Sequence, residues 1–461
     1  METLTATPTI PETPVQAAEA TAPYLADFEA FQRELSTPET AEPAGLQALR
    51  RQAIDAFARL GFPTLRQEEW RSTNVAAIAR TPFTRMTGEP ADLPAAALEP
   101  LIFDAAVRLV FVDGRFAPRL STLSTELPQG AFIGSLAEAL ARAPQLVEPH
   151  LARYARFDHH PFVALNTAFL RDGAFVYLPR GAVLEKPVHL LFMASGSEGA
   201  ATVNYPRNLI VAGENSQMAL VETYAGLGTY FTCAVTELVS GPGAVVDHYK
   251  VQRESVDAYH IATFQIEAER ACAPSSHSIS IGGAIVRNDV NAVLDGEGID
   301  CILNGLYLAE GRQLIDNHMR VEHAKPHCGS HELYKGILDG KARAVFNGLI
   351  HVRHGAQKTD AKQSNRNLLL SPDAIANSNP QLEIFADDVK CTHGSTVGQL
   401  DEDAVFYLRS RGIGKEAARS LLTYAFASDI VERIKVEPVR RDLEEFLFAR
   451  LPQGGVVRQA V

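Results

Sequence analysis

One short segment of the sequence combines a thiol and an imidazole in a pattern able to hold a metal ion. Within DDVKCTHGSTVGQL, Cys391 and His393 are two residues apart. In an extended strand such residues project from one face, so the two side chains would lie side by side. The pair suits iron or sulfide, although a lone thiol near a histidine more often reflects packing. Asp387 and Asp388 are adjacent and point to opposite faces, so they cannot form a glycosidase-type carboxylate pair with each other.

A second segment, DNHMRVEHAKPHCGSHELYKG, concentrates further groups that bind metals. They are His318, His323, His327, Cys328 and His331. Histidines four residues apart would share one face of a helix and bind zinc or iron. Pro326 and Gly329 break a helix at this point. We therefore expect surface and corner histidines here, with Cys328 as a small buried group.

Several classes of function are excluded or disfavoured by motif and composition. The sequence has no GxxxxGK[ST] phosphate loop, GxSxG elbow, HExxH helix or GxGxxG after a strand, so we expect no bound nucleotide. The net charge of -12, without a long basic run, argues against nucleic acid as a partner. With 461 residues and 46% hydrophobic content, the chain is long enough for two or three folded units.

The cellular compartment is indicated by three further features. The five cysteines stand far apart without a CxxC pair, which fits a reducing compartment. No apolar run is long enough to cross a bilayer, and the first residues do not resemble a signal peptide. We expect a cytoplasmic protein without a membrane segment.

Four of the cysteines are expected to be structural, because they alternate with apolar residues in the strands. They are Cys233, Cys272, Cys301 and Cys328.

Periodicity divides the chain into four parts. Residues 1–22 are rich in Thr, Pro, Ala and Glu and are expected to form a disordered tail. Residues 23–105 contain helical stripes, one of which is closed by Gly61 and Pro63. Residues 106–410 have the alternation of short strands, and no helix is expected to interrupt them. Residues 411–461 return to helical spacing as a hairpin over 413–451, which would cap strand edges, dock a partner, or both.

The long run of short strands excludes a doubly wound sheet and leaves a sandwich, a barrel, a propeller or a solenoid. Repetition favours the solenoid, because Asn304-Gly305-Leu306 recurs as Asn347-Gly348-Leu349. We interpret this offset as two turns with coils of roughly 20 residues.

Longer stretches of the sequence resemble a known family. FNGLIHVRHGAQKTDAKQSNRNLLLSPDAIANSNPQLEIFADDVKCTHGSTVGQL and FYLRSRGIGKEAARSLLTYAFASDIVERI are similar to the SufB/SufD family of iron-sulfur scaffold proteins. DNHMRVEHAKPHCGSHELYKGIL and GFPTLRQEEWRSTNV resemble it too, so the similarity covers nearly everything beyond the first 22 residues. Asn365 stands where a SufB-like chain would carry a sulfur-accepting cysteine, and Gly394 where it would carry an acidic residue. The chain therefore resembles the SufD branch.

The resemblance implies a mainly β protein, a right-handed parallel β-helix flanked by N-terminal and C-terminal helical domains. It implies a non-catalytic scaffold subunit that works with a SufB-like paralogue and a SufC-like ABC-type ATPase, and indirectly with a SufS/SufE-type sulfur donor. A nascent iron-sulfur cluster would be held at the interface with SufB by His393, with Cys391 as a second candidate ligand. Assistance in iron acquisition, a flavin in the complex and a homodimer are further possibilities of the family. The ATPase would dock on the C-terminal helices, for which we name Ile413, Leu421, Leu422, Phe426 and Ile430.

Two other classes of function stay open on the residues. A β-helix lyase or hydrolase acting on polysaccharides would need aromatic sugar platforms, and the chain has one tryptophan, Trp70. A docking protein without metal would use the solenoid only as a spacer.

Overall fold

The computed structural model describes residues 14–35, 44–91, 93–124, 126–196 and 199–460, and most of them form a β-helix. The strands are β1 (Thr84–Arg85), β2 (Val107–Val112), β3 (Arg115–Phe116), β4 (Phe132–Ser135), β5 (Ala174–Leu178), β6 (Val188–Ala194), β7 (Thr202–Asn204), β8 (Arg207–Ala212), β9 (Gln217–Gly226), β10 (Tyr230–Ser240), β11 (Val245–Glu254), β12 (Tyr259–Ala268), β13 (Ala273–Gly282), β14 (Ile285–Leu294), β15 (Asp300–Ala309), β16 (Leu314–His323), β17 (Gly329–Leu338), β18 (Arg343–Val352), β19 (Asp360–Leu369), β20 (Ile375–Ile384) and β21 (Lys390–Gly398).

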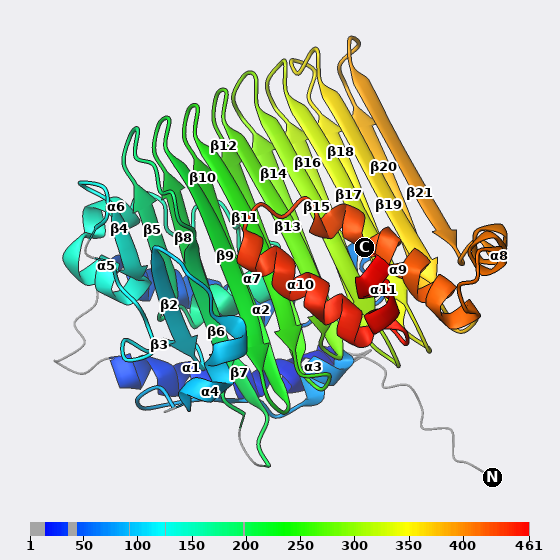
Figure 1. The fold of residues 1–461 in the computed structure, drawn as a ribbon. Helices are drawn as coiled ribbons and strands as arrows, with labels where there is room; N and C mark the ends of the chain where they lie inside the picture. The colour runs from blue at the N-terminus through cyan, green and yellow to red at the C-terminus, as the bar shows by residue number, and fades with distance from the viewer. Residues whose placement is uncertain (1–13, 36–43, 92, 125, 197–198, 461) are drawn as a thin grey trace.

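Successive strands alternate between two sheets, which is the arrangement of a flattened solenoid (Figure 1). One sheet has the order β20-β18-β16-β14-β12-β10-β8-β5-β4, with β1 and β7 beside this path. The other has the order β21-β19-β17-β15-β13-β11-β9-β6-β2-β3. From β5 onward the paired strands are parallel. The parallel β-helix expected from the sequence is thus confirmed.

The coil is longer than the sequence repeat suggested, and its length varies. Residues one coil apart pair in the ladders, as Tyr259 does with Ile285 and Arg343 with Ile375. The repeated tripeptides begin at Asn304 on β15 and at Asn347 on β18, which belong to different sheets. They are therefore one and a half coils apart, and the expected coil of roughly 20 residues is wrong. Turns of unequal length had hidden the period.

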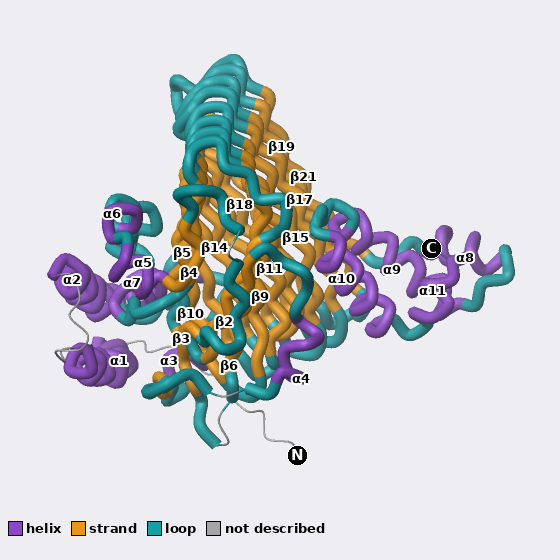
Figure 2. Tube along the Cα trace, turned by 60° about the vertical axis from the view of Figure 1, so that its left-hand side comes forward, coloured by secondary structure: helices purple, strands orange, loops and turns teal. Residues whose placement is uncertain are grey.

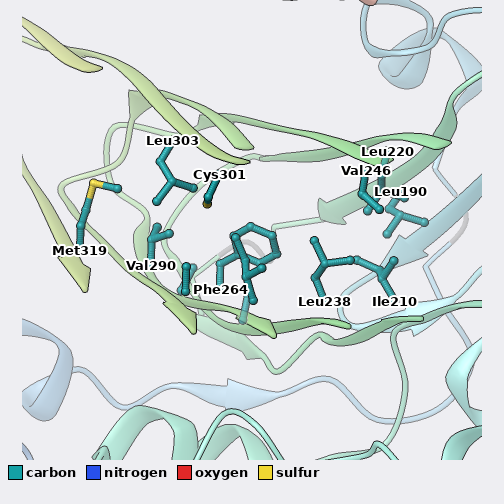
Figure 3. Close-up of a cluster of buried hydrophobic side chains, with 14 of the residues drawn as sticks. Leu190, Ile210, Leu220, Leu238, Val246, Phe264, Val290, Cys301, Leu303 and Met319 are labelled. Atoms are coloured by element: carbon teal, nitrogen blue, oxygen red, sulfur yellow. The ribbon is translucent and has the colours of Figure 1, made fainter. Parts of the chain in front are cut away.

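The interior of the solenoid contains the main hydrophobic core. Alternate residues of each strand point inward, so that side chains of the two sheets meet between them. Figure 3 shows this packing, in which Leu190, Leu220 and Val246 of one sheet lie opposite Ile210 and Leu238 of the other. The apolar columns continue through Phe264, Val290, Cys301, Leu303 and Met319. These buried columns fix the register in which later residues are stacked.

Most of the N-terminal helices cover the outer face of the sheet that contains β10 and β12, whereas the short helix Ala95–Leu98 lies against the other sheet (Figure 2). The helices before the β-helix core are α1 (Pro14–Leu35), α2 (Ala44–Leu60), α3 (Ala76–Arg80) and α4 (Ala95–Leu98), with 3-10 turns at Glu68–Trp70 and Glu99–Leu101; α5 (Leu136–Arg142), α6 (Pro144–Val147) and α7 (Pro161–Ala168) follow. Trp70 stacks on the fully buried Arg287, whose guanidinium carbon lies 3.7 Å from the ring centroid. This contact joins the N-terminal region to β14.

Two expectations for this region need correction. Residues 14–22 of the expected tail form the first turns of α1, because the alanine-rich segment favours a helix and Ala20 packs against the core, while residues 1–13 lie outside the described residues. Helices α5, α6 and α7 also interrupt the strands that were expected to run unbroken from residue 106. All eight residues of α7 are buried, so its sequence lacks the amphipathic stripe that would have revealed a helix.

The C-terminal helical hairpin lies across the outer face of the other sheet, and the helix that precedes it stands away from the strands (Figures 1 and 2). The C-terminal helices are α8 (Glu402–Ser410), α9 (Lys415–Val431), α10 (Glu437–Arg450) and α11 (Gly454–Ala460). Ion pairs anchor this region to the sheet, Lys335 to Asp429 at 2.7 Å, Arg253 to Asp442 at 2.7 Å, and Lys435 to Asp247 at 2.9 Å. The helical hairpin thus covers a sheet face and leaves the terminal strand edges uncovered.

Candidate metal site and interface at the open end of the β-helix

The last coil of the solenoid ends both sheets without a covering strand. Within the described chain β20 pairs only with β18 in its sheet, and β21 only with β19. Large apolar side chains on and beside these strands are exposed, namely Ile375, Ile384, Phe385 and Val397 at 40–49%. An unpaired parallel edge with exposed apolar side chains is suited to pairing with another chain.

His393 lies on this last strand, at the open end of an inward-facing column. Its register partner on β19 is Gln363, whose own partner on β17 is Glu332, and both partners are buried. His393 itself is exposed because no further coil covers it. Cys391 is two residues earlier on β21, in register with the buried Ala361. The register therefore puts the imidazole and the thiol on the same face of β21, which is the face predicted from their spacing.

The two groups at the open end form an incomplete donor set. Burial raises the pKa of the Cys391 thiol, which favours the protonated form at neutral pH. Among the described residues there is no cluster of three or more His, Cys, Asp or Glu side chains able to hold a metal ion. Metal sites in proteins commonly need three or four protein ligands. At most two ligands are available here, so a complete site requires donors from outside this chain.

Glu332 and Gln363, directly beneath His393, are a pair that the sequence analysis did not single out. The side-chain amide of Gln363 donates a hydrogen bond to Oε2 of Glu332 at 2.9 Å. Oε1 of Glu332 has no hydrogen-bond partner, and burial raises the pKa of this carboxyl to about 7. Each member of the column is one full coil from the next. Only the true coil length would have revealed that they stack.

Comparison with known proteins identifies the family. A family model described as "SUF system FeS cluster assembly, SufBD core domain" matches residues 192–426, and "SufBD protein N-terminal region" matches residues 19–190. The chain belongs to the SufBD family. An iron-sulfur cluster assembly SufBD family protein of Synechocystis is 34% identical over 411 residues, which cover 87% of this chain and 90% of the relative. The iron-sulfur cluster assembly protein SufD of Escherichia coli is 32% identical over 407 residues, which cover 87% and 92%.

Membership in the SufBD family makes this chain a SufD-like protein of iron-sulfur cluster assembly. A plant relative, the chloroplastic protein ABCI7 of Arabidopsis thaliana, is 28% identical over 414 residues, covering 88% of this chain and 86% of the relative. The family is one of assembly scaffolds, which removes the support for a polysaccharide lyase or hydrolase. None of the helices in the described residues is long and apolar enough to cross a membrane.

Asn365, which the resemblance set against a sulfur-accepting cysteine of SufB-like chains, is buried inside the β-helix. Its amide donates to the hydroxyl of Tyr307 at 3.0 Å and to the carbonyl of Tyr334 at 3.3 Å. Its carbonyl accepts from the amide of Asn367 at 2.7 Å. The side chain is thus part of a satisfied polar network.

The histidines between residues 318 and 331 do not converge in this SufBD chain. His318 lies 3.2 Å from Asp316, and His323 contacts the Ser330 hydroxyl at 2.9 Å. Burial lowers the pKa of His323 to about 4, so it is neutral at physiological pH. His327 has a positive φ and lies on an exposed corner. Their contacts are separate, so the structure brings no shared metal site together here.

The other cysteines are interior residues. Cys233, Cys272, Cys301 and Cys328 are buried, and burial raises the pKa of each thiol. A buried neutral thiol is a small apolar group rather than a nucleophile. Their surroundings match the structural role predicted for them.

The five residues named for ATPase docking differ in accessibility. Ile430 is fully buried in the core between α9 and the sheet, so it supports the helix instead of presenting a surface. Leu421 and Phe426 are half-buried and pack against that core, and Ile413 and Leu422 are half-buried outside it. Leu421 also borders a hollow of about 420 Å³ formed by α9, α10 and α11. On the neighbouring α8, Phe406 and Tyr407 are 69% and 57% exposed.

Proposed function

We propose that this SufD-like chain is a scaffold subunit that forms a heterodimer with a SufB-like paralogue through the open end of its β-helix. The observation that carries the proposal is the uncovered coil, in which β20 and β21 each have an unpaired edge and apolar side chains are exposed. A paralogue with the same coil offers strands of matching length and spacing. A second copy of this chain is the competing occupant.

His393 is the ligand that this subunit contributes to the nascent cluster. The cluster is the cargo of the assembly process. A neutral imidazole on an exposed strand coordinates ferrous iron, and Cys391 supplies a second donor on the same face. Because two donors do not complete a site, the remaining ligands come from the paralogue across the interface. The shared site explains why a chain with Asn365 in place of a sulfur-accepting cysteine still serves assembly.

A SufC-like ATPase docks on the outward side of the C-terminal helices. The exposed Phe406 and Tyr407 on α8, together with Ile413, Leu421 and Leu422, form a surface with apolar side chains beside the hollow of α9, α10 and α11. Aromatic side chains around a concavity are frequent anchors in protein interfaces. The ion pairs of Asp429 on α9 and Asp442 on α10 with the sheet hold the two helices in a fixed position on the β-helix.

Sulfur enters the complex through the paralogue, supplied by a SufS/SufE-type donor. Four of the five cysteines in this chain are buried, and the remaining thiol, Cys391, is half-buried. We place the complex in the cytoplasm, in keeping with the reduced cysteines.

Replacement of His393 tests the ligand role. The His393→Ala variant, expressed with both partners, should elute as the intact complex in gel filtration but contain at least about ten-fold less iron and sulfide, because one ligand is absent. Thr392→Ala is the matched control, since Thr392 is its exposed neighbour on the opposite face of β21. Full cluster content in the His393→Ala complex would refute the ligand role. Loss of the complex itself would favour a docking protein whose interface histidine binds no metal.

A further inference from the structure

Three arginines gather at the end of the solenoid opposite to His393. Arg85 lies on β1, Arg115 on β3, and Arg171 in the segment that joins α7 to β5. Together with the rings of Phe31 and Tyr205 they line a cavity of about 30 Å³. In Figure 2 the labels α1, α7 and β3 mark this corner of the molecule.

The local backbone holds Arg115 in this cavity. Asp113 and Gly114 both have positive φ, at 51° and 77°, and form the two-residue turn of the hairpin between β2 and β3. Val112 pairs with Arg115 across this turn. A Cβ atom at position 114 would lie 3.3 Å from Cβ of Asn204, so the turn also packs tightly against the cavity wall. The position of Arg115 is therefore fixed by the backbone.

The positive charges in the cavity are unequally compensated. Arg85 has two hydrogen bonds to the carboxylate of Glu34, at 3.0 and 2.9 Å, and lies 3.3 Å from Asp27. Arg171 lies 3.7 Å from Glu34. Arg115 takes part in none of the ion pairs found among the described residues, and its side chain donates instead to the carbonyl of Gly88. Burial first, and then the neighbouring Arg171 and Arg85, lower the pKa of Arg115, while the charges of Glu34 and Glu89 oppose this shift.

The two other carboxylates that line the cavity are engaged with donors elsewhere. Asp113 accepts hydrogen bonds from the backbone N–H and the hydroxyl of Ser195. Asp172 accepts from the hydroxyl of Ser135 and from the backbone N–H groups of Phe116, Ala137 and Gly173. These bonds leave the guanidinium of Arg115 as a donor without an anionic acceptor.

Two residues that line the cavity also carry a buried donor without a hydrogen-bond partner. The hydroxyl of Tyr205 is unpartnered although the residue is only 6% exposed, and Nε of Arg85 is likewise unpartnered. Phe169 stacks on the Tyr205 ring at 4.7 Å and holds it in place. Buried donors without acceptors are costly, and an anion with several oxygens would satisfy them together.

We propose that this cavity binds a small oxyanion of the phosphate or sulfate class, held by Arg115, Arg171 and the hydroxyl of Tyr205. Guanidinium groups match the geometry of such oxygens and keep their charge at all physiological pH values. A cavity of about 30 Å³ exceeds the 10–15 Å³ needed for one water molecule, but it does not admit a nucleotide. The bound ion would join α1 and the hairpin of β2 and β3 to the β-helix.

Isothermal titration of the full-length chain with sodium phosphate at pH 7 tests the proposal, with sodium chloride at equal ionic strength as the reference titrant. Wild type should show saturable phosphate binding, which sulfate displaces. Arg115→Ala should weaken this binding at least about ten-fold, because it removes the uncompensated guanidinium. Arg142→Ala is the matched control, since Arg142 is an exposed arginine on α5 paired with Glu138, and it should bind phosphate like wild type.

A second variant keeps the test decisive if Arg115→Ala fails to fold. Tyr205→Phe removes only the hydroxyl and retains the stacked ring, and it should weaken phosphate binding several-fold. Absence of saturable binding in wild type would overturn the proposal. Equal phosphate affinity in wild type and in the variant that folds would overturn it as well.

Discussion

The two ends of the β-helix differ in how their terminal strand edges are protected from pairing with other chains. At the N-terminal end each sheet finishes with a short antiparallel strand, β4 beside β5 and β3 beside β2. At the C-terminal end each sheet finishes with a full parallel strand of nine or ten residues, β20 and β21. Short terminal strands discourage further pairing, whereas long open ones invite it. The contrast supports the proposal that the C-terminal end is the one that pairs with a partner chain.

The polar side chains at the two ends also differ in whether their hydrogen-bonding groups are satisfied within the chain. Near the closed end, Arg207 and Glu237 form a fully buried ion pair at 2.7 Å, and Glu237 also accepts three backbone hydrogen bonds from residues 152, 154 and 155. At the open end His393 and Cys391 have no further coil above them. The polar groups around Glu237 have hydrogen-bond partners within the fold, whereas His393 at the open end is exposed to a partner.

Charges placed on the open edge should have the largest effect. The double variant Ile384→Lys/Val397→Lys puts two ammonium groups on β20 and β21, where both residues are at least 40% exposed. Affinity for the SufB-like paralogue should fall at least about 100-fold, because lysine on an edge opposes strand pairing. Biolayer interferometry measures the affinity, and thermal unfolding checks that the fold is unchanged.

The matched control for this variant is Leu123→Lys, near the closed end. Leu123 is 56% exposed and follows Thr122, which bonds to β2. Its replacement should leave the affinity within a factor of about two. Equal losses in the two variants would show that the open coil is not the interface.

Helix α9 also has a buried and an accessible side, and substitutions on the two sides should have different effects. A change on the buried side should lower stability, and a change on the accessible side should weaken ATPase binding. Ile430→Ala removes a fully buried side chain and should lower the free energy of unfolding by about 2–5 kcal/mol. Leu422→Asp, on a half-buried side chain outside that core, should change stability little but weaken ATPase binding about ten-fold. Denaturant unfolding and a pull-down with the ATPase measure the two effects. Unchanged ATPase binding by Leu422→Asp would contradict the proposed docking surface.

An effect that appears only at high pH is expected two coils inside the open end, at Glu332. Burial raises the pKa of this carboxyl from its usual value of 4.5 to about 7 in the folded protein. Between these values the folded state binds one more proton, so stability is greatest below the unfolded pKa and falls as pH rises through 7. Glu332→Gln abolishes this loss and should be more stable than wild type at pH 8 by up to about 3 kcal/mol, with little difference at pH 4.

Urea unfolding at the two pH values measures this difference. Glu432→Gln is the control for the loss of one carboxylate, because Glu432 is exposed on the C-terminal helices. A constant difference between wild type and Glu332→Gln across the pH range would show that this carboxyl does not titrate near 7.

Most of the fold followed from periodicity, because strand alternation and helical stripes are local signals. Asn304 and Asn347 show where such signals fail, since a repeated tripeptide cannot reveal that its copies lie on different sheets. The fully buried α7 fails for another reason, as it has no polar face to mark its period. Packing over long sequence distances decides both features.

The candidate site was predictable only in part. The shared face of Cys391 and His393 followed from their spacing, and the resemblance to a family drew attention to His393. The buried pair Glu332 and Gln363 had no signal in the sequence, because its stacking under His393 depends on turns of unequal length. The arginine cavity likewise combines positions 85, 115 and 171, which only the packing of α1 and the hairpin brings together.

The ion pairs of the C-terminal helices have a mechanical consequence. Lys435 is tied to Asp247 on β11 and Asp429 to Lys335 on β17, three ladder steps away in the same sheet. At about 4.8 Å a step, the helices brace roughly 14 Å of sheet against shear. A solenoid contacts only its nearest coils and would otherwise flex between them. We therefore expect the coils between β11 and β17 to resist bending relative to one another. A force applied to α9 would be distributed over four strands instead of acting on one.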